Sequence, residues 1–183
     1  MSHTSVLRRM LNSCSLVQLE DHYESKKVKL SESKISDSSI EILHVPPDTI
    51  VLDLDSAFNI EKLFHGKAGE CKRADYILLS ESAERVLFIE MKRSNSSATD
   101  ISLQLRGALC AFEYCQIIAR EFFDEHNFLK TYQKRFISIR HTDGYKRKTA
   151  IERTAELGKK HCLPDIPLRI SWAKTIQFKQ LAA

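Results

Sequence analysis

Residues 74–93 read ADYILLSESAERVLFIEMKR, and this stretch decides the fold. Two β-prone runs, 74–80 and 85–93, flank a short polar turn at 81–84. Such a pattern predicts a β-hairpin. The second run is apolar on both faces over 86–89, which is typical of a strand in the middle of a sheet that is covered on both sides. We therefore expect the second strand of the hairpin to be a central strand.

Periodic patterns on either side of the hairpin predict the other elements. Upstream, we expect a helix at 5–24, a polar loop at 31–39 and strands at 40–45 and 49–54. Downstream, an apolar stripe that repeats every three to four residues predicts a long helix at about 100–123. The remaining predicted elements are a strand at 135–141, a basic loop at 141–148, a short helix at 149–160 and a last strand at 168–178 that is broken near Ala173. This order predicts an α/β fold with a central mixed β-sheet flanked by helices.

Length and composition favour one soluble domain. The chain has 183 residues, of which 43% are hydrophobic, and no repeat or linker divides it. We expect a single domain over 1–183, with an N-terminal helix and polar loop (1–39), a catalytic core (40–140) and a basic C-terminal part (141–183). No apolar run approaches the ~20 residues that span a bilayer, and Arg8 and Arg9 interrupt the N-terminal segment. We therefore expect a cytoplasmic protein with no membrane partner.

The distribution of charge points to an anionic partner. Residues 1–129 contain 15 Lys or Arg and 20 Asp or Glu, whereas residues 130–183 contain 13 and 4. The C-terminal part thus carries a net charge of +9, against −5 for the rest. Nucleic acid is the usual partner of such a basic region. The five cysteines are odd in number and have no CxxC spacing, which argues against a disulfide framework or a zinc site.

Three charged side chains of the hairpin are the candidate site. Glu90 and Lys92 are two residues apart on one strand and therefore point to the same side of the sheet. If the strands pair through the short turn, Asp75 lies beside Glu90 at the same end of the hairpin. Burying these charges without partners costs several kcal/mol each. Two carboxylates, a backbone carbonyl and waters would instead form an oxygen shell suited to Mg²⁺.

The spacing of these residues resembles the PD-(D/E)XK nuclease superfamily. Asp75, fourteen residues, and then Glu90-x-Lys92 at the end of an apolar strand is the pattern in question, and Ala74 stands where the name-giving proline would be. Many members carry a glutamine on the next helix, where this chain has Gln104. The resemblance implies a restriction-endonuclease-like fold. It also implies hydrolysis of nucleic acid, DNA before RNA, with Mg²⁺ or Mn²⁺, in roles such as defence or repair.

The resemblance also implies roles for individual residues. Asp75, Glu90, Lys92 and Gln104 would be catalytic, and the Met91 carbonyl would join the two carboxylates on the metal. An upstream acid often completes that shell. We favour Glu61, while Glu20, Glu24 and Glu70 compete for the role. Basic and aromatic residues that flank the motif or follow Gly144 would contact nucleic acid, namely Lys72, Arg73, Arg93, Tyr145, Lys146, Arg147 and Lys148.

Other interpretations of the same residues stay open. Asp75, Glu90 and Lys92 could be a surface salt-bridge cluster, and such clusters contribute ~0–1 kcal/mol per pair. Asp53 and Asp55 form a rival carboxylate pair without a lysine at matching spacing, which favours structural roles or roles that support the site residues. The chain could also be a nucleic-acid-binding or assembly subunit without catalysis. For a nuclease domain this small, a homodimer or a larger complex would supply targeting.

Overall fold

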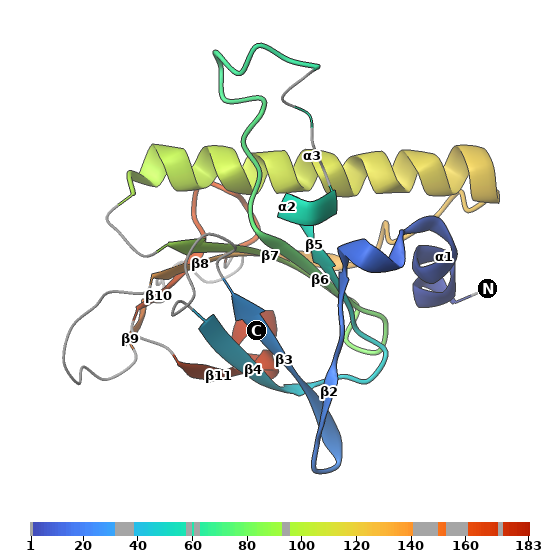
Figure 1. Ribbon diagram of the computed structural model, residues 1–183, viewed down its shortest axis with the longest axis horizontal. Helices are drawn as coiled ribbons and strands as arrows, with labels where there is room; N and C mark the ends of the chain where they lie inside the picture. The colour runs from blue at the N-terminus through green and yellow to red at the C-terminus, as the bar shows by residue number, and fades with distance from the viewer. Residues whose placement is uncertain are drawn as a thin grey trace.

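The hairpin predicted from the sequence lies in the middle of a seven-stranded sheet in the computed structural model of the protein (Figure 1). The structure describes residues 2–31, 39–57, 60, 63–92, 96–140, 150–152 (backbone only), 161–171 and 174–183. The strand order of this large sheet is β1-β5-β6-β7-β8-β10-β9. Its strands are β1 (Leu16–Val17), β5 (Ile50–Asp53), β6 (Tyr76–Ser80), β7 (Arg85–Lys92), β8 (Gln133–Arg140), β9 (Ala150–Glu152) and β10 (Leu168–Ser171).

Parallel and antiparallel pairs meet at β7. This strand pairs antiparallel with β6 and parallel with β8, and β8 in turn pairs parallel with β10. Three neighbouring strands therefore end at the same edge of the sheet. In open α/β sheets, ligands bind beyond the carboxyl ends of the parallel strands. The expectation of a mixed sheet with β7 at its centre is confirmed.

One face of the large sheet is covered by helices. The long helix α3 (Ala98–Phe123) lies across this face, and α1 (His3–Met10) packs at its far end (Figure 1). Val86 and Phe88 of β7 point into this helical core together with Leu105 and Phe112 of α3. The Phe88 ring stacks on Phe136 at 4.6 Å between centroids and meets Phe112 edge-on at 5.8 Å. These contacts fix α3 over the centre of the sheet.

The other face is covered by a second sheet instead of helices, which corrects the expectation that helices flank both faces. This small sheet has the strand order β11-β4-β3-β2. Its strands are β2 (Glu20–His22), β3 (Ser25–Ser31), β4 (Ser39–Val45) and β11 (Thr175–Gln177). The short helix α4 (Phe178–Ala182) closes the layer. Leu87, Ile89 and Met91 of β7 point into this inter-sheet core, so β7 is buried on both faces, as its sequence indicated.

Several predicted boundaries need correction. The helix expected at 5–24 ends at Met10, and a short 3₁₀ turn, η1 (Ser13–Ser15), precedes β1 and β2. The strand expected at 49–54 ends at Asp53, where the short helix α2 (Leu54–Ala57) begins. Where a helix was expected at 149–160, Ala150–Glu152 form the strand β9. Residues 153–160 lie outside the described part of the chain. The break predicted near Ala173 is confirmed by the separate strands β10 and β11.

In the ranges given above, no helix combines the length and the apolar character needed to cross a bilayer.

Candidate functional site

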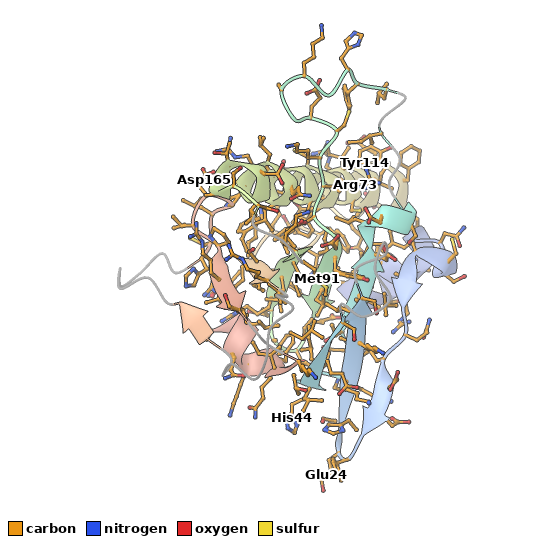
Figure 2. The ribbon with its side chains drawn as sticks, turned by 60° about the vertical axis from the view of Figure 1, so that its left-hand side comes forward. Glu24, His44, Arg73, Met91, Tyr114 and Asp165 are labelled. Atoms are coloured by element: carbon orange, nitrogen blue, oxygen red, sulfur yellow. The ribbon has the colours of Figure 1, made fainter. Side chains whose placement is uncertain are left out.

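The three charged residues of the hairpin meet on the side of the large sheet that faces α3. Glu90 and Lys92 follow Val86 and Phe88 at every second position of β7. All four side chains therefore point to the face that α3 covers. Asp75 comes directly before β6, whose first residue pairs with Ile89, which sets Asp75 beside Glu90. The Met91 N–H donates to Oδ2 of Asp75 at 2.6 Å. Met91 lies near the middle of the molecule (Figure 2).

Glu90 is the most unusual side chain of this group because it is completely buried. Burial, followed by the charge of Asp75, raises the pKa of its carboxyl group to about 8, although Lys92 opposes the shift. Nζ of Lys92 lies 2.6 Å from Oε1 of Glu90. That contact is a close ion pair that lowers the pKa of Glu90, and no donor other than Lys92 reaches either carboxylate oxygen among the described residues.

Lys92 has a polar environment at the rim of the same site. Its side chain is 22% exposed. Burial lowers the pKa of its ammonium group, but Glu90, Asp75 and Asp100 together raise it above its usual value. Lys92 is therefore a permanent positive charge that reaches from the buried Glu90 toward solvent.

The donor set fits a hard divalent cation. Glu90 offers two buried oxygens that no donor other than Lys92 reaches in the described chain, and the Asp75 carboxylate approaches from the residue before β6. Unpaired buried carboxylates are costly, and oxygen ligands are those that Mg²⁺ prefers. Among the described residues, however, no third His, Cys, Asp or Glu joins the two carboxylates in a cluster.

None of the described candidates for the upstream acid joins this pair. Glu20 in β2 lies 3.3 Å from the ammonium group of Lys27, and Glu24 lies at the tip of the β2–β3 hairpin, away from Met91 (Figure 2). Glu70 accepts hydrogen bonds from the backbone N–H groups of Gly66 and Ala68. A hydrogen bond from its own backbone N–H, followed by these two, lowers the pKa of its carboxyl group. Glu61, the favoured candidate, lies outside the described residues.

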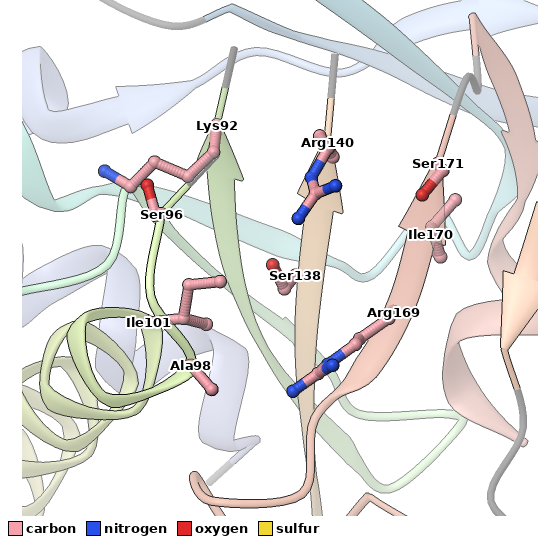
Figure 3. A pocket seen from close by; sticks show the side chains of 9 residues that line it. All are labelled: Lys92, Ser96, Ala98, Ile101, Ser138, Arg140, Arg169, Ile170 and Ser171. Carbon is pink, nitrogen blue, oxygen red and sulfur yellow. The ribbon is translucent and has the colours of Figure 1, made fainter. Parts of the chain in front are cut away.

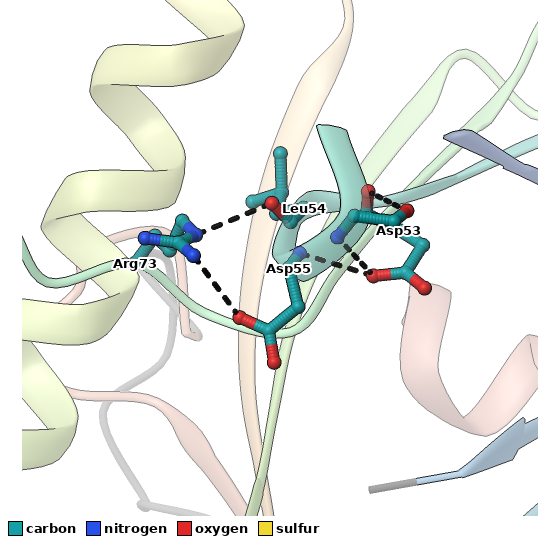
Figure 4. A network of polar contacts seen from close by, with 5 residues as sticks. Asp53, Leu54, Asp55 and Arg73 are labelled. Carbon is teal, nitrogen blue, oxygen red and sulfur yellow. Dashed lines mark hydrogen bonds and ion pairs between the residues drawn. The ribbon is translucent and has the colours of Figure 1, made fainter. Parts of the chain in front are cut away.

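Lys72 and Arg73, predicted to contact nucleic acid, both have acidic partners within the fold. Lys72 forms an ion pair with Asp100 at the start of α3. Arg73 donates from Nε to the Leu54 carbonyl at 3.2 Å, and its Nη2 lies 3.6 Å from Oδ1 of Asp55 (Figure 4). These partners hold both side chains on the protein. Arg93, Tyr145, Lys146, Arg147 and Lys148 lie outside the described part of the chain.

The rival carboxylates Asp53 and Asp55 have the structural roles that the sequence favoured. Oδ1 of Asp53 accepts from the N–H groups of Asp55 and Ser56 at 3.0 and 3.3 Å, which caps the short helix α2 (Figure 4). Asp55 pairs with Arg73. The two carboxylates are no longer on one strand face, because the chain turns into α2 after Asp53.

Gln104 lies at the end of the second turn of α3, between the buried Ile101 and Ala108. Its amide oxygen is buried and has no hydrogen-bond partner among the described residues. One turn further on, the Cα of Gly107 touches the backbone at Lys72: a Cβ there would lie 1.7 Å from the Lys72 carbonyl oxygen. Only glycine at position 107 therefore allows the backbone of α3 to lie this close to Lys72, three residues before Asp75.

Four residues near this site could not be identified from the hairpin motif. Asp100 acts on Glu90 and Lys92 through its charge, and Ser138, Arg140 and Arg169 come from β8 and β10. The parallel register sets Ser138 opposite Glu90 and Arg140 opposite Lys92. An alternating pattern in 133–140 could have indicated the face of Ser138 and Arg140. Their proximity to the hairpin depends on strand pairing that no local pattern encodes.

Comparison with known proteins adds no relative. No family model matches the sequence, and no curated protein and no solved structure matches it either.

Proposed function

We propose that this protein is a metal-dependent nuclease of the PD-(D/E)XK type, in which Asp75, Glu90 and Lys92 carry the chemistry. One observation supports the proposal above all others: Glu90 is fully buried, and among the described residues no donor other than the Lys92 ammonium group, 2.6 Å away, reaches its oxygens. A surface salt bridge does not account for this burial, whereas carboxylate oxygens of this kind suit a divalent cation.

The residues divide the work according to their positions. Asp75 and Glu90 would hold the cation with the Met91 carbonyl, and Mg²⁺ or Mn²⁺ would supply Lewis acidity for hydrolysis of a phosphodiester. Lys92, at the rim, stabilises negative charge that builds on the phosphate and orients the attacking water. The amide of Gln104, whose oxygen has no partner in the described chain, would orient the same water. A restriction-endonuclease-like arrangement is the finer fold that we propose for these parts.

A cleavage panel tests the proposal. Plasmid, linear duplex, single-stranded DNA and RNA are incubated with the protein in Mg²⁺, in Mn²⁺ and in EDTA. We expect cleavage of at least one substrate with metal and none with EDTA. Asp75→Asn, Glu90→Gln and Lys92→Ala should each lower the rate on the order of 10²-fold or more. Glu113→Gln, a change at an exposed position of α3, should cut like wild type.

The same panel can reject catalysis. If wild-type protein cuts nothing with Mn²⁺ and Lys92→Ala binds nucleic acid as tightly as wild type, the chain is a binding or assembly subunit with this fold. Calorimetry that shows no Mg²⁺ or Mn²⁺ binding at millimolar metal would rule out a metal site at Asp75 and Glu90.

A further inference from the structure

A small polar cavity adjoins the candidate catalytic residues at the carboxyl ends of β7, β8 and β10. Its volume is about 110 Å³, and its polar lining comes from Lys92, Ser96, Ser138, Arg140, Arg169 and Ser171. Figure 3 shows the guanidinium groups of Arg140 and Arg169 directed toward the space beside Ser138. Lys92 thus borders both the Glu90 carboxylate and this cavity.

The strand register builds the cavity wall from two rows of side chains. One row runs across the three strands as Glu90, Ser138 and Arg169. The next row runs as Lys92, Arg140 and Ser171. Neighbouring strands are ~4.8 Å apart, so the arginines lie one to two strand spacings from Glu90 and Lys92.

The charge of the wall favours an anion. Neither Arg140 nor Arg169 has a carboxylate partner among the described residues, in contrast to Lys72, Arg73 and Arg106. In the described chain, Glu90 in the first row and Asp100 in the first turn of α3 are the acidic side chains near the three basic ones of the wall, and Lys92 and Lys72 pair with them. The first turn of the 26-residue helix α3 begins at this cavity. Its N–H groups add positive potential.

The size and the polar lining of the cavity suit a small anion such as a phosphate group. Guanidinium groups match phosphate oxygens with paired hydrogen bonds. Serine hydroxyls, here Ser96, Ser138 and Ser171, are common additional donors to phosphate.

We propose that this cavity, which we call the arginine pocket, binds a phosphate of the nucleic acid strand next to the one that is cleaved. The inference rests on the proposed function, because it assigns the site near Glu90 a nucleic acid substrate. The bound group is either a terminal phosphate of a strand end or an internal phosphate of a continuous strand. The two sources share the same recognition chemistry and differ in whether a free end is needed.

The test measures binding separately from cleavage. Oligonucleotides with a 5′-phosphate, a 3′-phosphate or neither are titrated by fluorescence anisotropy in EDTA, with inorganic phosphate as the competitor. We expect Arg140→Gln and Arg169→Gln each to weaken binding about tenfold or more and to remove competition by phosphate. Arg140→Lys should recover part of the affinity, because it keeps the charge and loses the paired geometry. Arg120→Gln, a matched change at the far end of α3, should bind like wild type, and thermal unfolding confirms that all variants fold.

Each outcome has a defined meaning. A preference for one phosphorylated end assigns the pocket to a strand terminus, whereas equal binding of all three oligonucleotides, with loss in both arginine variants, assigns it to an internal phosphate. If both arginine variants bind every oligonucleotide and inorganic phosphate as wild type does, the inference is wrong. Loss of phosphate binding in these variants, together with no cleavage in any metal, would retain the pocket and reject the nuclease.

Discussion

The carboxyl group of Glu90 connects the folding energetics of the chain with its proposed chemistry. It sits at the end of a strand that is apolar on both faces, and the same burial that makes the strand central removes water from the carboxylate. Asp75 and Asp100 add negative charge nearby, and Lys92 supplies the neighbouring positive charge. Because proteins rarely bury an acid with so few donors, Glu90 is the residue on which the proposed function rests.

The first prediction concerns pH. Folding raises the pKa of Glu90 from 4.5 to about 8, so the native state holds a proton that the unfolded state has lost in this range. The free energy of unfolding in EDTA should therefore fall as pH rises from 4.5 to about 8, with each pKa unit worth ~1.4 kcal/mol. Glu90→Gln should remove this slope, as measured by urea unfolding at several pH values. An unchanged slope in Glu90→Gln would assign it to other groups, and Glu113→Gln is the control.

The second prediction concerns the ion pair. Lys92→Met leaves Glu90 buried without its cation, so the variant should lose up to ~3 kcal/mol of stability at pH 8. The double variant Glu90→Gln/Lys92→Met should recover most of this loss, since no charge is left unpaired. Chemical denaturation of the four proteins gives the coupling energy. Additive losses in the double variant would show that the two side chains do not interact.

Among the secondary-structure elements, those with a strong local period were predictable from sequence. The hairpin of β6 and β7 and the helix α3 have long apolar runs or stripes, and the structure places both within a few residues of expectation. The first helix was predicted too long because apolar residues continue past Met10. Strand β3 is not among the predicted elements, although Val28 and Leu30 alternate with lysines in its middle and this two-residue period is typical of a strand.

The third prediction tests how α3 holds the site. Ala is normally ~1 kcal/mol better than Gly within a helix, but a Cβ at Gly107 would lie 1.7 Å from the Lys72 carbonyl oxygen. Gly107→Ala should therefore destabilise the protein by ~1–3 kcal/mol and displace the segment that carries Asp75. Thermal unfolding measures the first effect, and the cleavage rate measures the second. A variant that is more stable than wild type and fully active would show that this contact does not position Asp75.

Across the full structure, remote parts of the chain build a sheet with a core on each face. Strands β1, β9 and β10 come from outside residues 40–140, yet they extend the sheet that carries the hairpin. Asp75, Glu90 and Lys92 were identifiable from sequence because they lie close together along the chain. Arg140 and Arg169 were not, because only the parallel pairing of β8 and β10 brings them beside Lys92.

The fourth prediction follows from the two cores sharing one sheet. Phe178 of α4 is buried in the inter-sheet core, so Phe178→Ala should cost ~3–5 kcal/mol. Because the large sheet borders both cores, far-UV and near-UV circular dichroism should still report one unfolding transition. Phe122→Ala removes a ring that is 75% exposed on α3 and should change stability little. Two separate transitions in Phe178→Ala would show that the layers fold independently.

The phenol of Tyr76 joins the two sheets directly next to Asp75. Its hydroxyl donates to the Ser31 carbonyl at 2.5 Å and accepts from the Ser31 N–H at 3.3 Å. The side chain of Asp75, the residue before Tyr76, points to the other face of the large sheet, which α3 covers. Sliding of β3 along the large sheet therefore strains the peptide unit that carries the Asp75 carboxylate. The hydrogen bonds between Tyr76 and Ser31 thus attach the small sheet to the backbone next to Asp75 and restrict the movement of Asp75.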